Sequence, residues 1–328
     1  MEAFEYRRAT TAGDALALAS SGNTQFLAGG TELLNWMRIG IEAPARVVDI
    51  NRLSGMDTIR ALPSGAIAIG ALCRLNDVAQ HSLVIRDLPV LSTSILKAAS
   101  AQIRNLATIG GNPLQRVRCP YFRADEPTPC NKRHPGSGCS ALSGFNEKHA
   151  IFGWTDDCVA VQPSDPAVSL AALDAVFITH RAGGGRRIPA RDFHVLPGEN
   201  PAAHHRLGRD ELIIGVEIPR AWPHSAYLKI RERESYEYAT VSVAVALDLD
   251  GDGVIRQARI ALGSVAMKPW RLDATERQLV GLRPDAPDVA QAVQAGFAEA
   301  RALSRNAYKI TLARNAVLRT IDDAARTA

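Results

Sequence analysis

Short apolar runs alternate with helically spaced apolar residues along the first part of the chain. Apolar residues at intervals of three and four predict helices over residues 11–20 and 32–38. Between them, residues 25–28 form an apolar run that ends at two glycines, which predicts a strand followed by a tight turn. The β-branched run at residues 45–50 and the apolar run at residues 66–69 predict two more buried strands. This order predicts small α/β units.

The middle of the chain loses this periodicity. Residues 91–101 predict a further helix, but Pro, Gly, Arg and Cys predominate over residues 113–154. A loop of this length without regular structure is uncommon inside a compact domain and is usually functional. Regular patterning returns with a helix predicted over residues 166–176 and strands over residues 176–179 and 210–218.

The last third of the chain has the pattern of a separate domain. Its predicted elements are strands at residues 225–231, 240–249 and 254–262 and helices that begin at Thr275 and Asp288. Strands grouped ahead of helices are typical of an α+β domain. Because Pro219 and Pro223 bracket a break in the pattern, we expect two domains, residues 1–222 and residues 223–328.

Two double-glycine turns are the first candidates for a binding site. Residues 27–34 read LAGGTELL and residues 108–112 read TIGGN, each after an apolar run. Glycine lets the backbone approach a ligand, and N–H groups at the start of a helix bind phosphate. Neither turn matches a dinucleotide-binding or P-loop motif, so two loops that hold one pyrophosphate and two turns without a ligand remain alternatives. Asp165 is either the N-cap of the next helix or an acceptor for a ribose hydroxyl.

Composition and charge narrow the class of protein. Of 328 residues, 46% are hydrophobic and 22% are charged, as in an ordinary globular protein. Lys and Arg number 38 against 34 Asp and Glu, an excess too small and too dispersed for nucleic-acid binding. No stretch reaches the roughly 18 apolar residues of a membrane-spanning helix, and the first ten residues lack the apolar core of a secretory signal. We therefore expect folding in the cytoplasm, no membrane insertion and no nucleic-acid partner.

Four of the five cysteines are gathered in the segment without periodicity: Cys119, Cys130, Cys139 and Cys158, whereas Cys73 stands alone. Disulfides would require an oxidising compartment. Structural zinc normally uses closely spaced cysteine pairs, which are absent here. Four thiolates around an iron–sulfur cluster fit wide spacing in a loop rich in Gly and Pro. Spacing alone leaves these three alternatives open. Basic residues that flank the thiols would offset the negative charge of a cluster: Arg116, Arg118, Arg123, Lys132, Arg133 and Lys148.

With these motifs in view, the sequence resembles the FAD-binding (medium) subunit of the molybdenum hydroxylases, the family of xanthine dehydrogenase and carbon monoxide dehydrogenase. The matching segments are FLAGGTELL (26–34), VVDINRL (47–53), QIRNLATIGGN (102–112), PSD (163–165), DEL (210–212), ALGSVA (261–266) and KPWR (268–271). The resemblance covers nearly the whole chain. It implies an α+β protein with a two-subdomain, PCMH-type FAD-binding domain and a C-terminal domain of antiparallel sheet and helices.

The resemblance also implies which residues hold FAD. The two glycine segments would hold the pyrophosphate through backbone amides, Asp165 would meet the ribose or the diphosphate, and Lys229 would lie near the flavin ring. An aromatic side chain covers the ring in many members, and Tyr236 and Tyr238 are equal candidates. The implied cofactor-binding residues are Leu27, Ala28, Gly29, Gly30, Thr31, Glu32, Leu33, Leu34, Thr108, Gly110, Gly111, Asn112, Asp165 and Lys229.

A long insertion, at about residues 114–158, separates two motifs that most members of the family join by a short connection. The insertion resembles the medium subunit of bacterial periplasmic aldehyde oxidoreductases, which carries a [4Fe-4S] cluster beside FAD. This resemblance implies that the cluster ligands are Cys119, Cys130, Cys139 and Cys158.

The implied function is electron transfer and not substrate chemistry. A molybdopterin-binding large subunit would oxidise an aldehyde, a small [2Fe-2S] subunit would relay the electrons, and this chain would receive them at FAD within a heterotrimer. A partner that bears a twin-arginine signal would carry the folded complex to the periplasm. The competing hypothesis is a non-catalytic, zinc-stapled nucleotide-binding scaffold.

Overall fold

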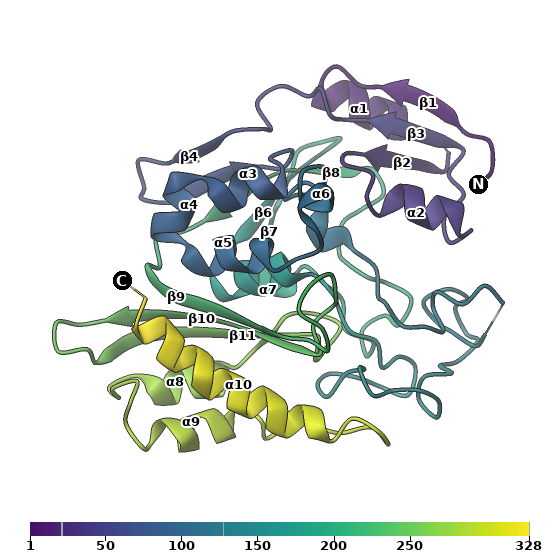
Figure 1. The fold of residues 1–328 in the computed structure, drawn as a ribbon. Helices are drawn as coiled ribbons and strands as arrows, with labels where there is room; N and C mark the ends of the chain where they lie inside the picture. The colour runs from purple at the N-terminus through teal and green to yellow at the C-terminus, as the bar shows by residue number, and fades with distance from the viewer. Residues whose placement is uncertain (21, 127, 328) are drawn as a thin grey trace.

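The computed structural model describes residues 1–20, 22–126 and 128–327, and the described residues form three sheets (Figure 1). The N-terminal sheet is parallel, with the strand order β1-β3-β2. Its three strands and the two helices that connect them are, in chain order, β1 (Glu5–Arg8), α1 (Ala12–Ala19), β2 (Thr24–Leu27), α2 (Leu33–Arg38) and β3 (Arg46–Asp49). The predicted strand, glycine turn and helix are therefore β2, the turn at Gly29 and Gly30, and α2.

The second sheet is antiparallel, with the order β4-β5-β8-β6-β7. Its strands are β4 (Ile59–Ala61), β5 (Ile67–Gly70), β6 (Val176–Arg181), β7 (Arg187–Pro189) and β8 (Glu211–Ile218). The helices of this part of the chain are α3 (Leu75–Gln80), α4 (Ser82–Asp87), α5 (Pro89–Leu96), α6 (Ala101–Arg104) and α7 (Asp165–Ala172). Two short 3-10 helices are η1 (Asn112–Leu114) and η2 (Ala190–Asp192). Strand β5 pairs with β8, so this sheet joins strands from before and after the cysteine-rich stretch.

The third sheet, with the order β12-β11-β10-β9, lies between two layers of helices (Figure 1). Its elements are β9 (His224–Ile230), β10 (Val241–Leu249), β11 (Ile255–Gly263), β12 (Trp270–Arg271), α8 (Asp273–Leu279), α9 (Val289–Ala295) and α10 (Tyr308–Ala325). Residues 241–247 of β10 are all buried, which explains why six of these seven residues are apolar. Ala244 and Ala246 pack in the core with α5 and α7, whereas Val243 and Val245 pack with α10.

This architecture confirms the α+β class and most of the predicted elements. The single helix predicted over residues 91–101 is wrong, because α5 and α6 are separate there. Ala99 between them has a φ of 46°, which a right-handed helix cannot contain, and Ser100 caps α6 by accepting a backbone hydrogen bond at 3.3 Å. Among the described residues, no helix is both long and apolar enough to span a membrane.

Residues 115–164, here called the cysteine segment, contain no helix or strand in their described part, as the sequence predicts. The segment follows an irregular path beside the C-terminal domain (Figure 1). An isolated bridge pairs Cys130 with Cys139, and the Phe152 ring stacks on Trp270 at a centroid distance of 5.0 Å. Contacts with the following domain therefore hold a segment that has little regular structure of its own.

Candidate functional site

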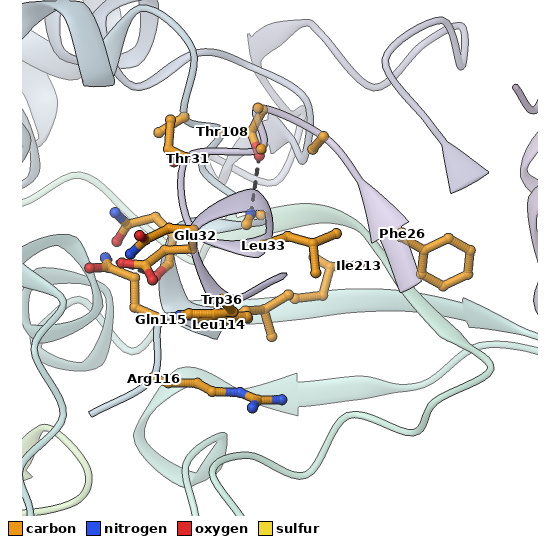
Figure 2. Close-up of a pocket in the computed structure, with 18 of the residues that line it drawn as sticks. Phe26, Thr31, Glu32, Leu33, Trp36, Thr108, Leu114, Gln115, Arg116 and Ile213 are labelled. Atoms are coloured by element: carbon orange, nitrogen blue, oxygen red, sulfur yellow. Dashed lines mark hydrogen bonds between the residues drawn. The ribbon is translucent and has the colours of Figure 1, made fainter. Parts of the chain in front are cut away.

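A cavity of about 770 Å³ lies where the first glycine segment, the second sheet and the loop after β9 meet (Figure 2). Its volume is within the roughly 300–1,000 Å³ that is typical of ligand and cofactor sites. The Thr108 hydroxyl accepts a hydrogen bond from the Gly111 N–H at 3.2 Å and shapes one side of the cavity (Figure 2). Twelve of the residues predicted to bind the cofactor line this cavity: Ala28, Gly29, Gly30, Thr31, Glu32, Leu33, Thr108, Gly110, Gly111, Asn112, Asp165 and Lys229.

Backbone packing explains why the first segment contains glycine. A Cβ atom on Gly29 would lie 2.0 Å from the carbonyl oxygen of Leu106, so the first glycine segment packs against the backbone that leads into the second one. Gly30 has a φ of 71°, which residues with a side chain rarely adopt. Leu27 and Leu34 are not among the lining residues, and their side chains lie against Gly30 instead.

A buried ion pair forms the wall of the cavity nearest the third sheet. Lys229 Nζ lies 2.8 Å from Asp165 Oδ2, and the Tyr227 hydroxyl donates to Asp165 Oδ1 at 2.6 Å. Burial raises the pKa of the Asp165 carboxyl, and Lys229 opposes that shift. The alternative that Asp165 is an N-cap is wrong, because Ser164 caps α7 by accepting from the Ala167 N–H at 3.0 Å. The carboxylate is thus free to hold Lys229 at the cavity.

Two arginines at the start of the cysteine segment form another wall. The Arg116 guanidinium lies 4.7 Å from the centre of the Trp36 ring. Both side chains are labelled in the close-up of the cavity (Figure 2). Arg118 forms an ion pair with Glu32, and its guanidinium lies 4.7 Å from the centre of the Tyr238 ring. From the sequence these arginines are expected only to offset the negative charge of the thiolates. An irregular segment has no periodicity from which their position at the cavity could be predicted.

The cavity contains many polar atoms that lack a partner. Half of the twelve buried, unpaired side-chain N and O atoms in the described part of the chain belong to residues that line it. They are Glu32 Oε2, Trp36 Nε1, Arg118 Nε, both ring nitrogens of His204, and His205 Nδ1. Each unsatisfied buried atom costs about 1–3 kcal/mol, so this cavity suits a polar ligand that supplies the missing partners.

His204 and His205 are functional candidates that the sequence analysis misses. Burial lowers the pKa of His204 well below its usual value and that of His205 to about 4. Both imidazoles are therefore neutral near pH 7, and each offers one donor and one acceptor. The only sequence signal was the pair of adjacent histidines itself, which carries no spacing information.

The four clustered cysteines surround a second, small cavity of about 10 Å³. Burial raises the pKa of the Cys119 thiol to about 12 and also raises that of Cys158, so neither thiol ionises readily without a positive partner. Cys73 is buried elsewhere, with its thiol 3.5 Å from the Thr58 carbonyl oxygen. No group of three or more His, Cys, Asp or Glu side chains within the described residues is arranged to hold a metal ion.

Two basic side chains adjoin this small cavity. Lys132 is only 8% exposed, and its ammonium group donates to the carbonyl oxygens of Pro201 at 3.1 Å and Ala203 at 2.7 Å. Within the described part of the chain it has no carboxylate partner. His149 has Nε2 only 3.3 Å from Cys119 Sγ. The thiols therefore lie beside a buried cation and a ring nitrogen.

The large and small cavities share a wall. The Phe122 ring lines the small cavity, here called the cysteine cavity, and the His204 ring lines the large cavity. The two rings meet edge to face, with centroids 5.5 Å apart. At this point the two candidate sites are therefore separated by two side chains in direct contact.

Comparison with known proteins agrees with this arrangement. Residues 2–221 match the family model described as the FAD binding domain in molybdopterin dehydrogenase. Residues 226–324 match the CO dehydrogenase flavoprotein C-terminal domain. These two matches define the class of protein as a flavoprotein component of a molybdopterin-dependent oxidoreductase.

Individual relatives extend over the whole chain. The aldehyde oxidoreductase FAD-binding subunit PaoB of Escherichia coli is 43% identical over 99% of both chains. The glyceraldehyde dehydrogenase medium chain of Sulfolobus acidocaldarius is 28% identical over 85% of this chain and 81% of its own. A structure of carbon monoxide dehydrogenase from Hydrogenophaga pseudoflava superposes with a TM-score of 0.76 and 26% identity, covering 100% of this chain and 99% of the other. The chain belongs to the family of FAD-binding subunits of the molybdenum hydroxylases, which confirms the resemblance found in its sequence.

Proposed function

We propose that this chain is the electron-transfer subunit of a molybdenum-containing aldehyde oxidoreductase, with FAD in the large cavity and a [4Fe-4S] cluster in the cysteine cavity. The identity of 43% to an aldehyde oxidoreductase subunit supports the substrate class. The observation that carries the proposal is the shared wall between a cavity of cofactor size and a cavity lined by four thiols. FAD and the cluster supply the redox chemistry, and the chain supplies position and electrostatic environment.

The large cavity fits FAD in both shape and polarity. The close contact of Gly29 with Leu106, two residues before the second glycine segment, keeps both segments at the same cavity, where a diphosphate can meet backbone atoms without side-chain obstruction. The buried pair of Asp165 and Lys229 offers a carboxylate and an ammonium group at the opposite wall. Neutral His204 supplies a donor and an acceptor that lack protein partners. The chain would thus fix the cofactor at several points and exclude water between them.

Four thiols that line one cavity beside a buried cation support an anionic cluster there. A [4Fe-4S] cluster spreads its four thiolates over four irons, so the sulfur atoms need not converge on one point. Lys132 lies beside Cys130 and Cys158 and would offset the negative charge of the thiolates. Backbone N–H groups of Tyr121 and Phe122 favour the ionised form of Cys119, and such hydrogen bonds to sulfur raise the potential of a cluster.

Optical spectra and metal analysis of the purified complex test this proposal. We expect flavin bands together with a broad iron–sulfur shoulder, and four irons for each copy of this chain beyond those of the [2Fe-2S] subunit. Cys130→Ser should lose these four irons, whereas the matched variant Cys73→Ser should keep them. A colourless protein with stoichiometric zinc would support the zinc-stapled scaffold and contradict the proposal. Equal iron in both variants would refute the ligand set.

The partners in this proposal are a molybdopterin-binding large subunit, which oxidises the aldehyde, and a small [2Fe-2S] subunit, which passes electrons to this chain. The similarity to medium chains and FAD-binding subunits of several such enzymes supports the assignment. We propose that the heterotrimer folds in the cytoplasm and reaches the periplasm through a partner with a twin-arginine signal. Cell fractionation with and without that signal tests the route, and a periplasmic complex in both cases would contradict it.

A further inference from the structure

The start of the cysteine segment forms the partition between the two cavities. From Arg116 to Cys119 the side chains alternate, as they do in an extended chain. Arg116 and Arg118 line the large cavity, whereas Val117 and Cys119 line the cysteine cavity. A displacement of one side of this short stretch must therefore move the other.

Arg118 contacts two other segments that line the large cavity, here called the flavin cavity. It pairs with Glu32 in the first glycine segment and lies over Tyr238 in the loop between β9 and β10. Its side chain is 20% exposed, and its Nε atom is buried without a hydrogen-bond partner. Arg118 thus links three segments at the cavity, and the residue that follows it is a proposed cluster ligand.

The stretch has no regular structure of its own to hold Arg118. Residues 115–119 lie outside the helices and strands of the described chain, so ladder hydrogen bonds do not hold this backbone. Fixing an otherwise loose segment before a ligand binds lowers the entropy cost of binding. An occupied cysteine cavity would fix Cys119 and, through it, the position of Arg118.

We propose that Arg118 is a positioning residue that couples the two cofactor sites, so that a loaded cysteine cavity strengthens FAD binding and bound FAD stabilises the loaded cysteine cavity. The inference rests on the proposed function, because it requires a metal cluster at the four thiols. Coupling between two binding sites is reciprocal, and each ligand changes the affinity of the other by the same factor.

A double-mutant cycle tests this coupling in the purified complex. The dissociation constant of FAD is measured by flavin fluorescence after the flavin is removed and titrated back. Arg118→Ala and Cys130→Ser should each weaken FAD binding by about tenfold, a typical size for coupling between sites. The double variant should also be about tenfold weaker, because both changes remove the same coupling. If the two effects multiply instead, Arg118 is only a contact residue and the proposal is overturned.

Arg209→Ala is the matched control, because Arg209 is an exposed arginine that lines the flavin cavity from outside the cysteine segment. Its effect on FAD binding should multiply with that of Cys130→Ser. Arg118→Lys keeps the charge but loses the planar stack on Tyr238, and it serves as the milder variant if Arg118→Ala does not assemble. We expect it to lose most of the coupling.

Iron release provides the reciprocal measurement. Removal of FAD should speed the loss of iron to a chelator in the wild-type complex, and this difference should vanish in Arg118→Ala. Equal release rates with and without FAD in the wild type would overturn the coupling. The wild-type iron content separates the two failures: a complex without iron beyond that of the [2Fe-2S] subunit refutes the cluster and the coupling together, whereas a complex with four further irons and multiplicative effects refutes the coupling alone.

Discussion

The flavin cavity and the cysteine cavity are built on opposite principles. The flavin cavity is open, about 770 Å³, and its walls are backbone turns and sheet edges that glycine and buried ion pairs hold in place. The cysteine cavity is about 10 Å³ and is lined by a segment without helix or strand in its described part. The first site is framed by regular elements, whereas the second is held by contacts within an irregular segment and with the following domain.

Lys229→Met should show the largest effect, because the flavin cavity depends on its buried ion pair. Removal of one partner leaves Asp165 buried without its cation, which costs about 3–5 kcal/mol. We expect a marked fall in the melting temperature and loss of FAD while iron is retained. The double variant Asp165→Asn with Lys229→Met should regain most of the stability without FAD. A single variant with normal melting and normal flavin content would show that the pair is not part of the site.

Gly29→Ala tests whether the first glycine segment must pack against the backbone of Leu106. The added methyl group would meet the Leu106 carbonyl oxygen, and because this atom belongs to the backbone, we expect a loss of about 3 kcal/mol in unfolding free energy. FAD content should fall with it, whereas iron should remain. Gly251→Ala is the control, because nothing lies within 4 Å of a Cβ at that position. Equal stability of the two variants in thermal unfolding would contradict the contact.

Glu211 gives the flavin side of the molecule a sensitivity to acid. Burial disfavours its ionised form, but hydrogen bonds from Arg186, the Gly208 N–H and Thr179 outweigh burial and lower its pKa to about 2. A carboxylate with a lowered pKa stabilises the fold above its unfolded pKa, and this stabilisation is lost as the pH falls from about 4.5 to about 2.

Glu211→Gln should therefore cost about 2 kcal/mol at pH 7 and flatten the loss of stability over that acidic range. Urea unfolding at several pH values measures both effects. The control is Glu217→Gln, whose ion pair with Arg187 is more exposed and should contribute less than about 1 kcal/mol. If the loss of unfolding free energy at acid pH is the same in Glu211→Gln and the wild type, Glu211 is not the cause of the acid sensitivity.

Lys132→Met should have the smallest effect, with a sign that depends on the content of the cysteine cavity. In the iron-loaded protein the buried ammonium group offsets thiolate charge, so its loss should destabilise by about 1 kcal/mol. In iron-free protein the same ammonium group is buried without a carboxylate in the described part of the chain, and its replacement should be neutral or stabilising. Thermal unfolding of both forms measures the difference. The same sign in both forms would mean that the cavity holds no anionic group.

Local sequence patterns predicted the elements whose formation depends on neighbours in the chain. The apolar runs became β2, β3 and β10, and the glycine turns became loops because their backbone cannot carry side chains at Gly29 and Gly30. The helix predicted over residues 91–101 failed at Ala99, where a positive φ interrupts an otherwise suitable sequence. Aspartate is common at N-caps, so the sequence favours Asp165 for this position, but the adjacent Ser164 caps α7 instead.

Contacts that depend on tertiary packing were not predictable in this way. The segment that contains Arg118 has no periodic pattern of apolar residues. Tertiary packing alone therefore decides which of its side chains line the flavin cavity and which line the cysteine cavity. His204 meets Phe122 although more than eighty residues separate them, and no local pattern records that contact. The His149 ring reaches the Cys119 sulfur, thirty residues away in the chain, and no local pattern indicates that contact either. The cofactor-binding and ligand roles of the individual residues stay predictions.

The pairing of Ile67 in β5 with Ile218 in β8 also bears on the order of folding. Such a distant pairing gives the second sheet a high contact order, which slows folding because a long loop must close first. During synthesis all four clustered cysteines are made before β8, and residues of β8 and β9 line the flavin cavity. We expect the cysteine segment to be available for metal loading before the flavin cavity exists, and closure of this sheet to be the slow phase in refolding kinetics.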